Sequence, residues 1–475
     1  TLLMAEKGDL RDSMVSETFV RQQLIVRDAG GNGILLVAES HAWSLPSFEL
    51  PDRHTADTDY INQVALERFG IEVTVLRCLD DTRDGSKTIR TYEMELHGAD
   101  PPDTSGLRWF DRDEIIGLSG RFHGDRAAVE KWFTKDSLAH DELPNWQRVG
   151  WWRAATDWIA DRIVAKHSSR IVKMIQRRQW GSSCVIEIIC DEGKYFFKAT
   201  PQKSCERDLA VFLARHSPAV PRVVAVHPQH NWMLMRAFAG SSLEQSCDAA
   251  RWAAGLAAYA EIQLRCTSMT AELTRLGCQR LDMKKVSDDI DALLSDSVVL
   301  CEGEPEGLSV KQIEYLRTKA PGLKRGCARL AASAVPLTIE HGDLWPGNIL
   351  VNETGCAILD WEDARLAHPF FSAAPLIAGM ETYQPEMSLR DAHNRFCEIY
   401  VRAFARFGDP KTLREMFAVA LPIAMLEIAI RYWRQPPAIV AVNPWMRTLV
   451  PYFAGLPYRG LGVDDDWPDS VEKPH

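Results

Sequence analysis

The stretch IEHGDLWPGNILVNETGCAILDWED, residues 339–363, gathers acids and an amide at two bends that flank two short apolar runs. Asp343 precedes Asn348 by five positions, and Asp360 follows twelve positions later. The segment could be a turn-rich surface loop. It also has the groups that phosphoryl transfer requires, namely oxygen ligands for a cation on the nucleotide phosphates and an Asp that orients the attacking hydroxyl.

The two apolar runs predict a short hairpin, because Val351 and Ile358–Leu359 stand on either side of the turn sequence NETG. Such a hairpin would hold Asn348 and Asp360 side by side. An amide oxygen and a carboxylate suit Mg²⁺, which prefers oxygen ligands. Asp343 is then left as the base that orients the acceptor hydroxyl.

Composition excludes several classes of protein. The 475 residues carry a net charge of −10, which argues against a nucleic-acid-binding protein or one attracted to an anionic membrane. Eleven scattered cysteines without a C-x-x-C indicate reduced thiols, and the charged N-terminus has no signal core, so a cytoplasmic protein is expected. The longest apolar run, 416–426, is too short for a membrane span and predicts a buried helix. The oligomeric state stays open.

Residues 15–135 predict a separate β-rich domain. Its strands FVRQQLIVRD, GILLVAES, IEVTVLRCL and TIRTYEMEL are interrupted by a helix that carries Ile61, Val64, Ala65 and Phe69 on one face and stops at Gly70.

This order, closed by LRWFDRDEI, resembles the Nudix hydrolases, which implies an α/β/α sandwich. Those enzymes hold magnesium on a helix with an Arg-Glu-x-x-Glu-Glu cluster. The corresponding positions here are Gln63, Val64, Glu67 and Arg68. A single carboxylate cannot hold a hard cation, so a catalytically inactive Nudix-like domain is expected. The rival hypothesis is an active nucleotide-diphosphate hydrolase with the remainder of the chain as its regulator.

Three further segments complete the predicted organisation. Residues 136–165 are a tryptophan-rich linker and helix, whose aromatic rings are expected to bury area at a domain junction rather than form a substrate box. Residues 166–240 are β-rich, and residues 241–465 are mainly helical.

The motif His-Gly-Asp-x-x-x-x-Asn, followed by Ile-Leu-Asp-Trp-Glu, resembles the aminoglycoside phosphotransferase and choline kinase group, relatives of the protein kinases. The resemblance covers about 155–460. It implies an α+β, bilobal protein-kinase-like fold that uses ATP, or GTP, with Mg²⁺. Within that group His341 would support the loop rather than perform acid-base chemistry. Ser372 stands where an anchoring Asp is common, so a weaker contact is expected there.

The resemblance also implies nucleotide-binding residues in the small lobe. Lys198 in YFFKAT would contact the phosphates, and Glu206 on the next helix would pair with it, with Asp208 as the competitor. The connection between the lobes would present Met235, Arg236 and Phe238 to the adenine. The phosphate-covering turn would contain Gly181, Ser182 and Ser183, although no Gly-x-Gly-x-x-Gly is present.

The predicted acceptor is a hydroxyl of a small molecule, of the antibiotic, sugar, nucleoside or amino-alcohol type. A Ser or Thr of a peptide is the alternative, and a pseudokinase that only binds is another. Arginines among the candidate wall residues would repel a polycation and suit a neutral or anionic acceptor as well. The substrate wall is expected to include Trp345, Glu362, Glu427, Arg431 and Trp433.

Overall fold

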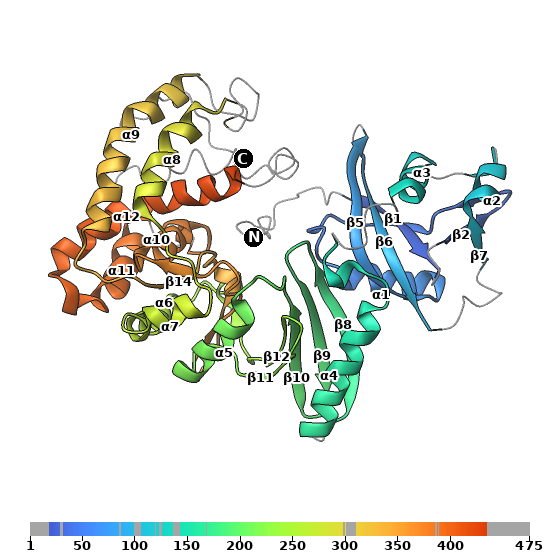
Figure 1. Ribbon diagram of the computed structural model, residues 1–475, viewed down its shortest axis with the longest axis horizontal. Helices are drawn as coiled ribbons and strands as arrows, with labels where there is room; N and C mark the ends of the chain where they lie inside the picture. The colour runs from blue at the N-terminus through green and yellow to red at the C-terminus, as the bar shows by residue number, and fades with distance from the viewer. Residues whose placement is uncertain are drawn as a thin grey trace. The chain divides into compact units, whose positions relative to one another are not determined.

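The computed structural model describes residues 19–434, with gaps at 29–31, 85–86, 99–105, 119, 123–125, 136–142, 168, 298–299, 301–309, 385–386 and 388 (Figure 1). The predictions for the start of the linker and for helix up to residue 460 therefore fall partly outside the described residues. The described chain divides into two compact units. The first contains the residues up to Arg207 together with Val223–Ala237, and the second contains Asp208–Arg222 and the residues from Phe238 onward.

A seven-stranded sheet forms the N-terminal part of the first unit. Its order is β3-β2-β1-β6-β5, with β4 beside β1 and β7 beside β2. β1 and β6 run parallel, whereas β5 and β6 form an antiparallel pair. The strands are β1 (Phe19–Arg27), β2 (Gly33–Glu39), β3 (Ala42–Ser44), β4 (Ser47–Pro51), β5 (Glu72–Asp84), β6 (Lys87–His97) and β7 (Leu107–Asp111).

Helices pack on both faces of this sheet. Alternate residues of a strand point to opposite faces, so consecutive apolar residues give the sheet two apolar faces to cover. Leu24 packs with α1 (Asp59–Phe69), whereas its neighbour Ile25 packs with α2 (Arg112–Gly117) and α3 (Arg126–Lys135). The result is a helix–sheet–helix sandwich. The predicted helix and its stop are confirmed, since α1 ends at Gly70 in the left-handed conformation with a φ of 69°.

The sequence prediction missed two short strands, β3 and β4, in the segment between β2 and α1. The single remaining carboxylate of the Nudix-like pattern, Glu67, is exposed and accepts a hydrogen bond from Gln63 at 2.7 Å. The Nudix-like identity of this part stays a prediction.

A second sheet of five antiparallel strands follows, in the order β11-β12-β10-β9-β8. α4 (Trp151–His167) packs against it. Trp151 and Trp158 are buried there beside Trp232, with ring centroids 5.9 and 6.0 Å from it. These tryptophans are core residues of the small sheet. Its strands are β8 (Ile171–Gln179), β9 (Cys184–Cys190), β10 (Gly193–Ala199), β11 (Val223–Val226) and β12 (Trp232–Arg236).

The second unit is mainly helical and carries its strands in two small sheets. β13 (Ser241–Ser242), β15 (Ile349–Val351) and β16 (Cys356–Ile358) form one, and β14 (Thr338–Glu340) pairs with β17 (Arg365–Ala367) in the other. The helices are α5 (Glu206–His216), which begins in the first unit, α6 (Ala249–Cys266), α7 (Thr270–Arg275), α8 (Met283–Ser295), α9 (Val310–Ala331), α10 (Phe370–Ala378), α11 (Leu389–Arg402) and α12 (Pro410–Trp433).

The apolar run at 416–426 lies within α12, most of whose residues from 416 onward are buried, so the predicted buried helix is confirmed. α12 packs against α9 and α10 (Figure 1). None of the described helices has both the length and the apolar character that a membrane span needs.

Candidate active site

The loop that carries Asp343 begins at the end of a completely buried strand. β14 pairs with β17 through Glu340 and Arg365, and the chain then turns through Gly342. Gly342 has a φ of 81°, and a Cβ there would lie 2.3 Å from the carbonyl oxygen of Asp363. Only glycine fits this turn without displacing the neighbouring backbone. The loop that positions Asp343 therefore depends on the glycine of the His-Gly-Asp motif.

The predicted hairpin is confirmed. β15 and β16 pair with Ile349 opposite Ile358, and the Leu359 N–H donates to the Asn348 carbonyl at 2.9 Å. Asn348 and Asp360 thus stand at the open end of one hairpin. The Asn348 side-chain amide also donates to the Asp343 carbonyl at 3.0 Å, which ties the two ends of the loop together.

Asp360 has a φ of 63°, which is uncommon for a residue with a side chain. Asp tolerates this left-handed conformation better than most residues, because its short polar side chain can bond locally. Such backbone conformations are retained where the surrounding structure enforces them, and they occur often at functional sites. Trp361, which follows, is buried and donates to the Ile358 carbonyl at 3.1 Å.

His341 joins the two loops. Its Nδ1 accepts the Asp343 N–H at 3.3 Å, so the other ring nitrogen, Nε2, carries the proton and donates to the Leu359 carbonyl at 2.7 Å. The ring is completely buried and lies 4.7 Å from the ring of Trp361. With both nitrogens engaged, His341 holds loops in place, as the sequence predicted.

Lys198 and Glu206 form a buried ion pair in the first unit. The Lys198 ammonium lies 2.8 Å from the Glu206 carboxylate, and the two residues are 6% and 2% exposed. Lys198 is on the central strand β10, opposite Val185 and Met233, and Glu206 opens α5. Their nucleotide-binding role stays a prediction.

The predicted connecting segment begins at the end of β12. Met235 is half-buried, Arg236 is exposed, and the Ala237 N–H donates to the Lys194 carbonyl at 3.0 Å. In the second unit the ring of Phe238 packs against Gly240, where a Cβ would lie 2.7 Å from that ring.

The predicted phosphate turn, which contains Gly181, Ser182 and Ser183, connects β8 with β9. The Trp180 N–H donates to the Ser183 carbonyl at 2.8 Å and closes the turn. The Trp180 carbonyl accepts from the indole N–H of Trp146 at 2.7 Å. Gly181 is exposed and the two serines are half-buried.

The five predicted wall residues have different surroundings. The ring of Trp345 lies over Gly347, where a Cβ would be 2.2 Å from it, and Glu362 is half-buried two positions after Asp360. Glu427 is buried and pairs with Arg365, and the Trp433 indole donates to Asp296 at 2.9 Å. A role in lining a substrate site would require the Glu427 carboxylate to leave that ion pair.

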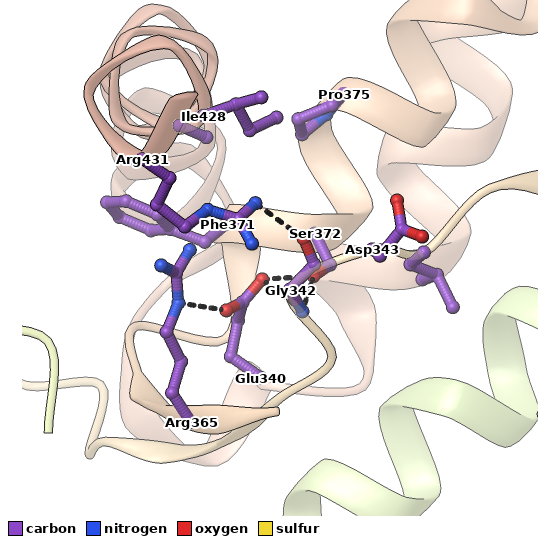
Figure 2. A pocket seen from close by; sticks show the side chains of 11 residues that line it. Glu340, Gly342, Asp343, Arg365, Phe371, Ser372, Pro375, Ile428 and Arg431 are labelled. Carbon is purple, nitrogen blue, oxygen red and sulfur yellow. Dashed lines mark hydrogen bonds and ion pairs between the residues drawn. The ribbon is translucent and has the colours of Figure 1, made fainter. Parts of the chain in front are cut away.

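One pocket in the second unit has Asp343 at its edge and Arg431 in its wall (Figure 2). Apolar groups of Leu344, Phe371, Pro375, Ala424 and Ile428 line the remainder, with the polar side chains of Glu340, Arg365 and Ser372. Sequence reasoning did not single out Glu340 or Arg365. The signal available was an acid directly before His-Gly-Asp and an arginine directly after the second loop.

Glu340 is charged despite being buried. Burial raises its pKa, but the Arg365 guanidinium, the Ser372 hydroxyl and Arg431 outweigh burial and hold the pKa of Glu340 below its ordinary value. Burial lowers the pKa of Arg365, but the carboxylates of Glu340 and Glu427 outweigh burial and raise that pKa above its ordinary value. The pocket therefore adjoins a permanent group of buried charges.

Comparisons with known proteins bear on this region. Residues 191–408 match the profile of the phosphotransferase enzyme family. The comparison with curated proteins gave no match. Among solved structures, a macrolide 2'-phosphotransferase type I is similar at 14% identity with a TM-score of 0.42, covering 63% of this chain and 97% of that one.

A choline/ethanolamine kinase family protein from Mesorhizobium loti is similar at 16% identity with a TM-score of 0.42, covering 64% of this chain and 93% of that one. A spectinomycin phosphotransferase, solved with ADP and spectinomycin, is similar at 10% identity with a TM-score of 0.43, covering 64% of this chain and 97% of that one. The family match at residues 191–408 includes both loops of the candidate site.

Proposed function

We propose that the protein is an ATP-dependent kinase that transfers the γ-phosphoryl group to a hydroxyl of a small molecule. The observation that carries the proposal is the pair of loops at 341–348 and 359–361. They lie within the region that matches a phosphotransferase family, and they are tied by the His341–Leu359 and Leu359–Asn348 hydrogen bonds.

The proposed base is Asp343. Its carboxylate accepts the proton of the acceptor hydroxyl while that oxygen bonds to the γ-phosphorus and the bond to the leaving ADP oxygen breaks. Asp343 is 7% exposed and borders the pocket of Figure 2, which supports its assignment as the group that meets the acceptor. General-base assistance of this kind contributes typically about 10²–10⁴ in rate.

Asn348 and Asp360 fit a magnesium ion. The amide nitrogen of Asn348 is engaged by the Asp343 carbonyl, which directs the amide oxygen, a suitable ligand, away from that contact. Asp360 contributes a carboxylate from a backbone held at positive φ. When bound, Mg²⁺ neutralises charge on the phosphate oxygens.

Lys198 completes the proposed nucleotide contacts. Glu206 holds the ammonium at 2.8 Å in a buried position, so little conformational entropy remains to be lost when a phosphate oxygen is bound. Met235, Arg236 and Phe238 would contact the base, and Gly181, Ser182 and Ser183 the phosphates.

The proposed acceptor is neutral or anionic rather than polycationic. Arg431 lies in the wall of the pocket that Asp343 borders, and a guanidinium there repels cations. In a panel of sugars, nucleosides, hydroxy acids, amino alcohols and aminoglycosides, we expect phosphorylation of the uncharged or acidic members. Exclusive activity on aminoglycosides would contradict this choice of acceptor.

Asp343→Asn tests the proposal. We expect ATP with Mg²⁺ to bind this variant as it binds the parent protein, whereas ADP release in the presence of the acceptor panel falls at least 100-fold, because the amide cannot accept the hydroxyl proton. The matched control is Glu353→Gln, an exposed acid in the turn of the same hairpin. Full transfer activity in the Asp343 variant would overturn the assignment.

The proposal includes an inactive Nudix-like domain at the N-terminus. Its support is the helix–sheet–helix sandwich and the sequence of α1, where Glu67 is the single carboxylate left at the positions of the Nudix pattern. Magnesium-dependent hydrolysis of ADP-ribose by the Asp343→Asn protein would contradict it.

A further inference from the structure

Both backbone polar groups of Gly342, the residue before the proposed base, are held by side chains. The Gly342 N–H donates to the Glu340 carboxylate at 3.0 Å and to the Ser372 hydroxyl oxygen at 3.1 Å. The Gly342 carbonyl accepts from the Arg431 guanidinium at 2.7 Å. Figure 2 shows these contacts beside Asp343, whose carboxylate points away from them. Gly342 is covalently bound to Asp343, so these contacts determine the direction in which the base leaves the backbone.

Two of these partners, Glu340 and Arg431, belong to a group of four buried or partly buried charges. The Arg365 Nε lies 2.7 Å from Glu340, and both terminal nitrogens of Arg365 pair with Glu427 on α12. Arg431 lies 3.3 Å from Glu427. The Ser372 hydroxyl on α10 donates to Glu340. The group Glu340, Arg365, Glu427 and Arg431, with Ser372, is called the Gly342 network below.

Stability alone is a weak explanation for this network. Buried ion pairs lose their hydration, and well-packed apolar residues of similar volume are often equally stabilising or better. Charged groups that are fully paired do fix geometry, because each bond is directional and the burial makes misalignment unfavourable. The contacts of Glu340, Ser372 and Arg431 converge on the backbone of Gly342, the residue that precedes Asp343.

We propose that Glu340, acting together with Ser372, is a positioning residue for the phosphoryl transfer: it holds the backbone N–H of Gly342 and thereby orients Asp343 toward the acceptor hydroxyl. The inference rests on the proposed function. This role requires no contact of Glu340 with substrate or nucleotide. It acts through the backbone of Gly342.

The geometry also predicts that a carboxylate at position 372 can replace the carboxylate of Glu340. The Ser372 oxygen already lies 3.1 Å from the Gly342 nitrogen. An aspartate at position 372 reaches one bond further than serine, so its carboxylate can accept the Gly342 N–H and face Arg365. It would repel Glu340, which must therefore be neutral for the exchange to succeed.

The test compares Glu340→Gln, Ser372→Ala and the double variant Glu340→Gln/Ser372→Asp. We expect kcat to fall at least tenfold for Glu340→Gln and less for Ser372→Ala, with KM for ATP unchanged, because a displaced base affects the chemical step. The double variant should recover most of the lost kcat. The control is Ser217→Ala, which removes another buried hydroxyl that accepts one backbone N–H, from Ala219 at 3.1 Å.

Hydrogen exchange of the backbone amides at 341–348 provides a readout that does not depend on catalysis. We expect faster exchange in Glu340→Gln, recovery in the double variant and no change in Ser217→Ala. If the wild type transfers no phosphoryl group while exchange follows this pattern, the proposed function fails and the holding of the loop stands.

Two results would overturn the positioning role. One is a kcat for Glu340→Gln within twofold of the wild type. The other is a double variant that recovers neither kcat nor protection of the loop. Ser372→Ala, the mildest change, tests the same bond if the Glu340 variant does not fold.

Discussion

Among the residues of the two loops, Asp360 has an uncommon backbone conformation. Its φ of 63° restricts the position to residues that accept the left-handed region, chiefly Gly, Asn and Asp. Asp supplies both this conformation and a carboxylate. The position can therefore be tested by removing the charge without changing the backbone preference.

Asp360→Asn is the corresponding substitution. We expect the stabilisation of the protein by ATP with Mg²⁺ to be lost, because the amide is a weaker ligand for a hard cation, while the unfolding temperature without ligand stays close to that of the parent. At a ligand concentration of about 100 Kd the parent gains about 2.7 kcal/mol. Thermal unfolding with and without ATP and Mg²⁺ measures this. An undiminished ligand shift in the variant would contradict the proposed metal ligand.

At the scale of elements, the seven-stranded sheet is bonded to β8 of the small sheet through side-chain amides. The Val75 N–H donates to the Gln176 side-chain oxygen at 2.9 Å, and the Gln176 amide donates to the Val75 carbonyl at 2.8 Å. The Gln179 side-chain amide donates to the Leu76 carbonyl at 2.8 Å, and the Gln179 backbone N–H donates to the Ala56 carbonyl. The predicted phosphate turn begins two residues after Gln179, so β8, the strand that leads into the turn, is fixed to the N-terminal sheet.

Gln176→Ala should weaken this joint. It leaves the buried N–H and carbonyl of Val75 without their partner, and each such group costs about 1–3 kcal/mol. We expect the free energy of unfolding by urea to fall by roughly 2–4 kcal/mol. Gln63→Ala, on the exposed face of α1, is the control and should change it by less than about 0.5 kcal/mol. Equal effects of the two substitutions would refute the importance of the joint.

For the whole molecule, the histidine buried in the helical unit links stability to pH. His368 is 1% exposed, with one ring nitrogen 3.3 Å from the Ser333 hydroxyl, and burial lowers its pKa to about 3. The unfolded chain, with a histidine pKa near 6.5, binds the proton more readily than the folded protein does. The contribution of His368 is therefore complete above pH 6.5 and is lost progressively as the pH falls toward 3.

His368→Gln should make this loss smaller. Between pH 6.5 and pH 5 the wild type is expected to lose about 2 kcal/mol through this group, at about 1.4 kcal/mol per pH unit. The variant starts less stable but should show a flatter dependence in urea unfolding across that range. His41→Gln, at an exposed position, should keep the slope of the wild type. An unchanged slope in the His368 variant would show that burial does not control the titration.

Sequence reasoning was accurate where the determining contacts are close along the chain. The hairpin that presents Asn348 and Asp360 follows from two apolar runs and a turn. The stop of α1 at Gly70 follows from the freedom of glycine at positive φ. The resemblance to the kinase group implied the Lys198–Glu206 pair, eight residues apart, and the two side chains are bonded in the structure. Trp146, Trp151 and Trp158 of the linker are buried as expected, but in the core of the small sheet, whereas the sequence predicted a domain junction.

The sequence by itself therefore determined which polar groups the two loops present, because residue types and short spacings decide which donors and acceptors a turn carries. Only the tertiary structure decided how Asp343 is held. Glu340 meets Arg365 across 25 residues and Ser372 across 32, and Arg365 meets Glu427 across 62. These pairings depend on how α10 and α12 pack against β14 and β17. Hydrophobic periodicity shows which face of a helix is buried but does not show which buried charges will meet.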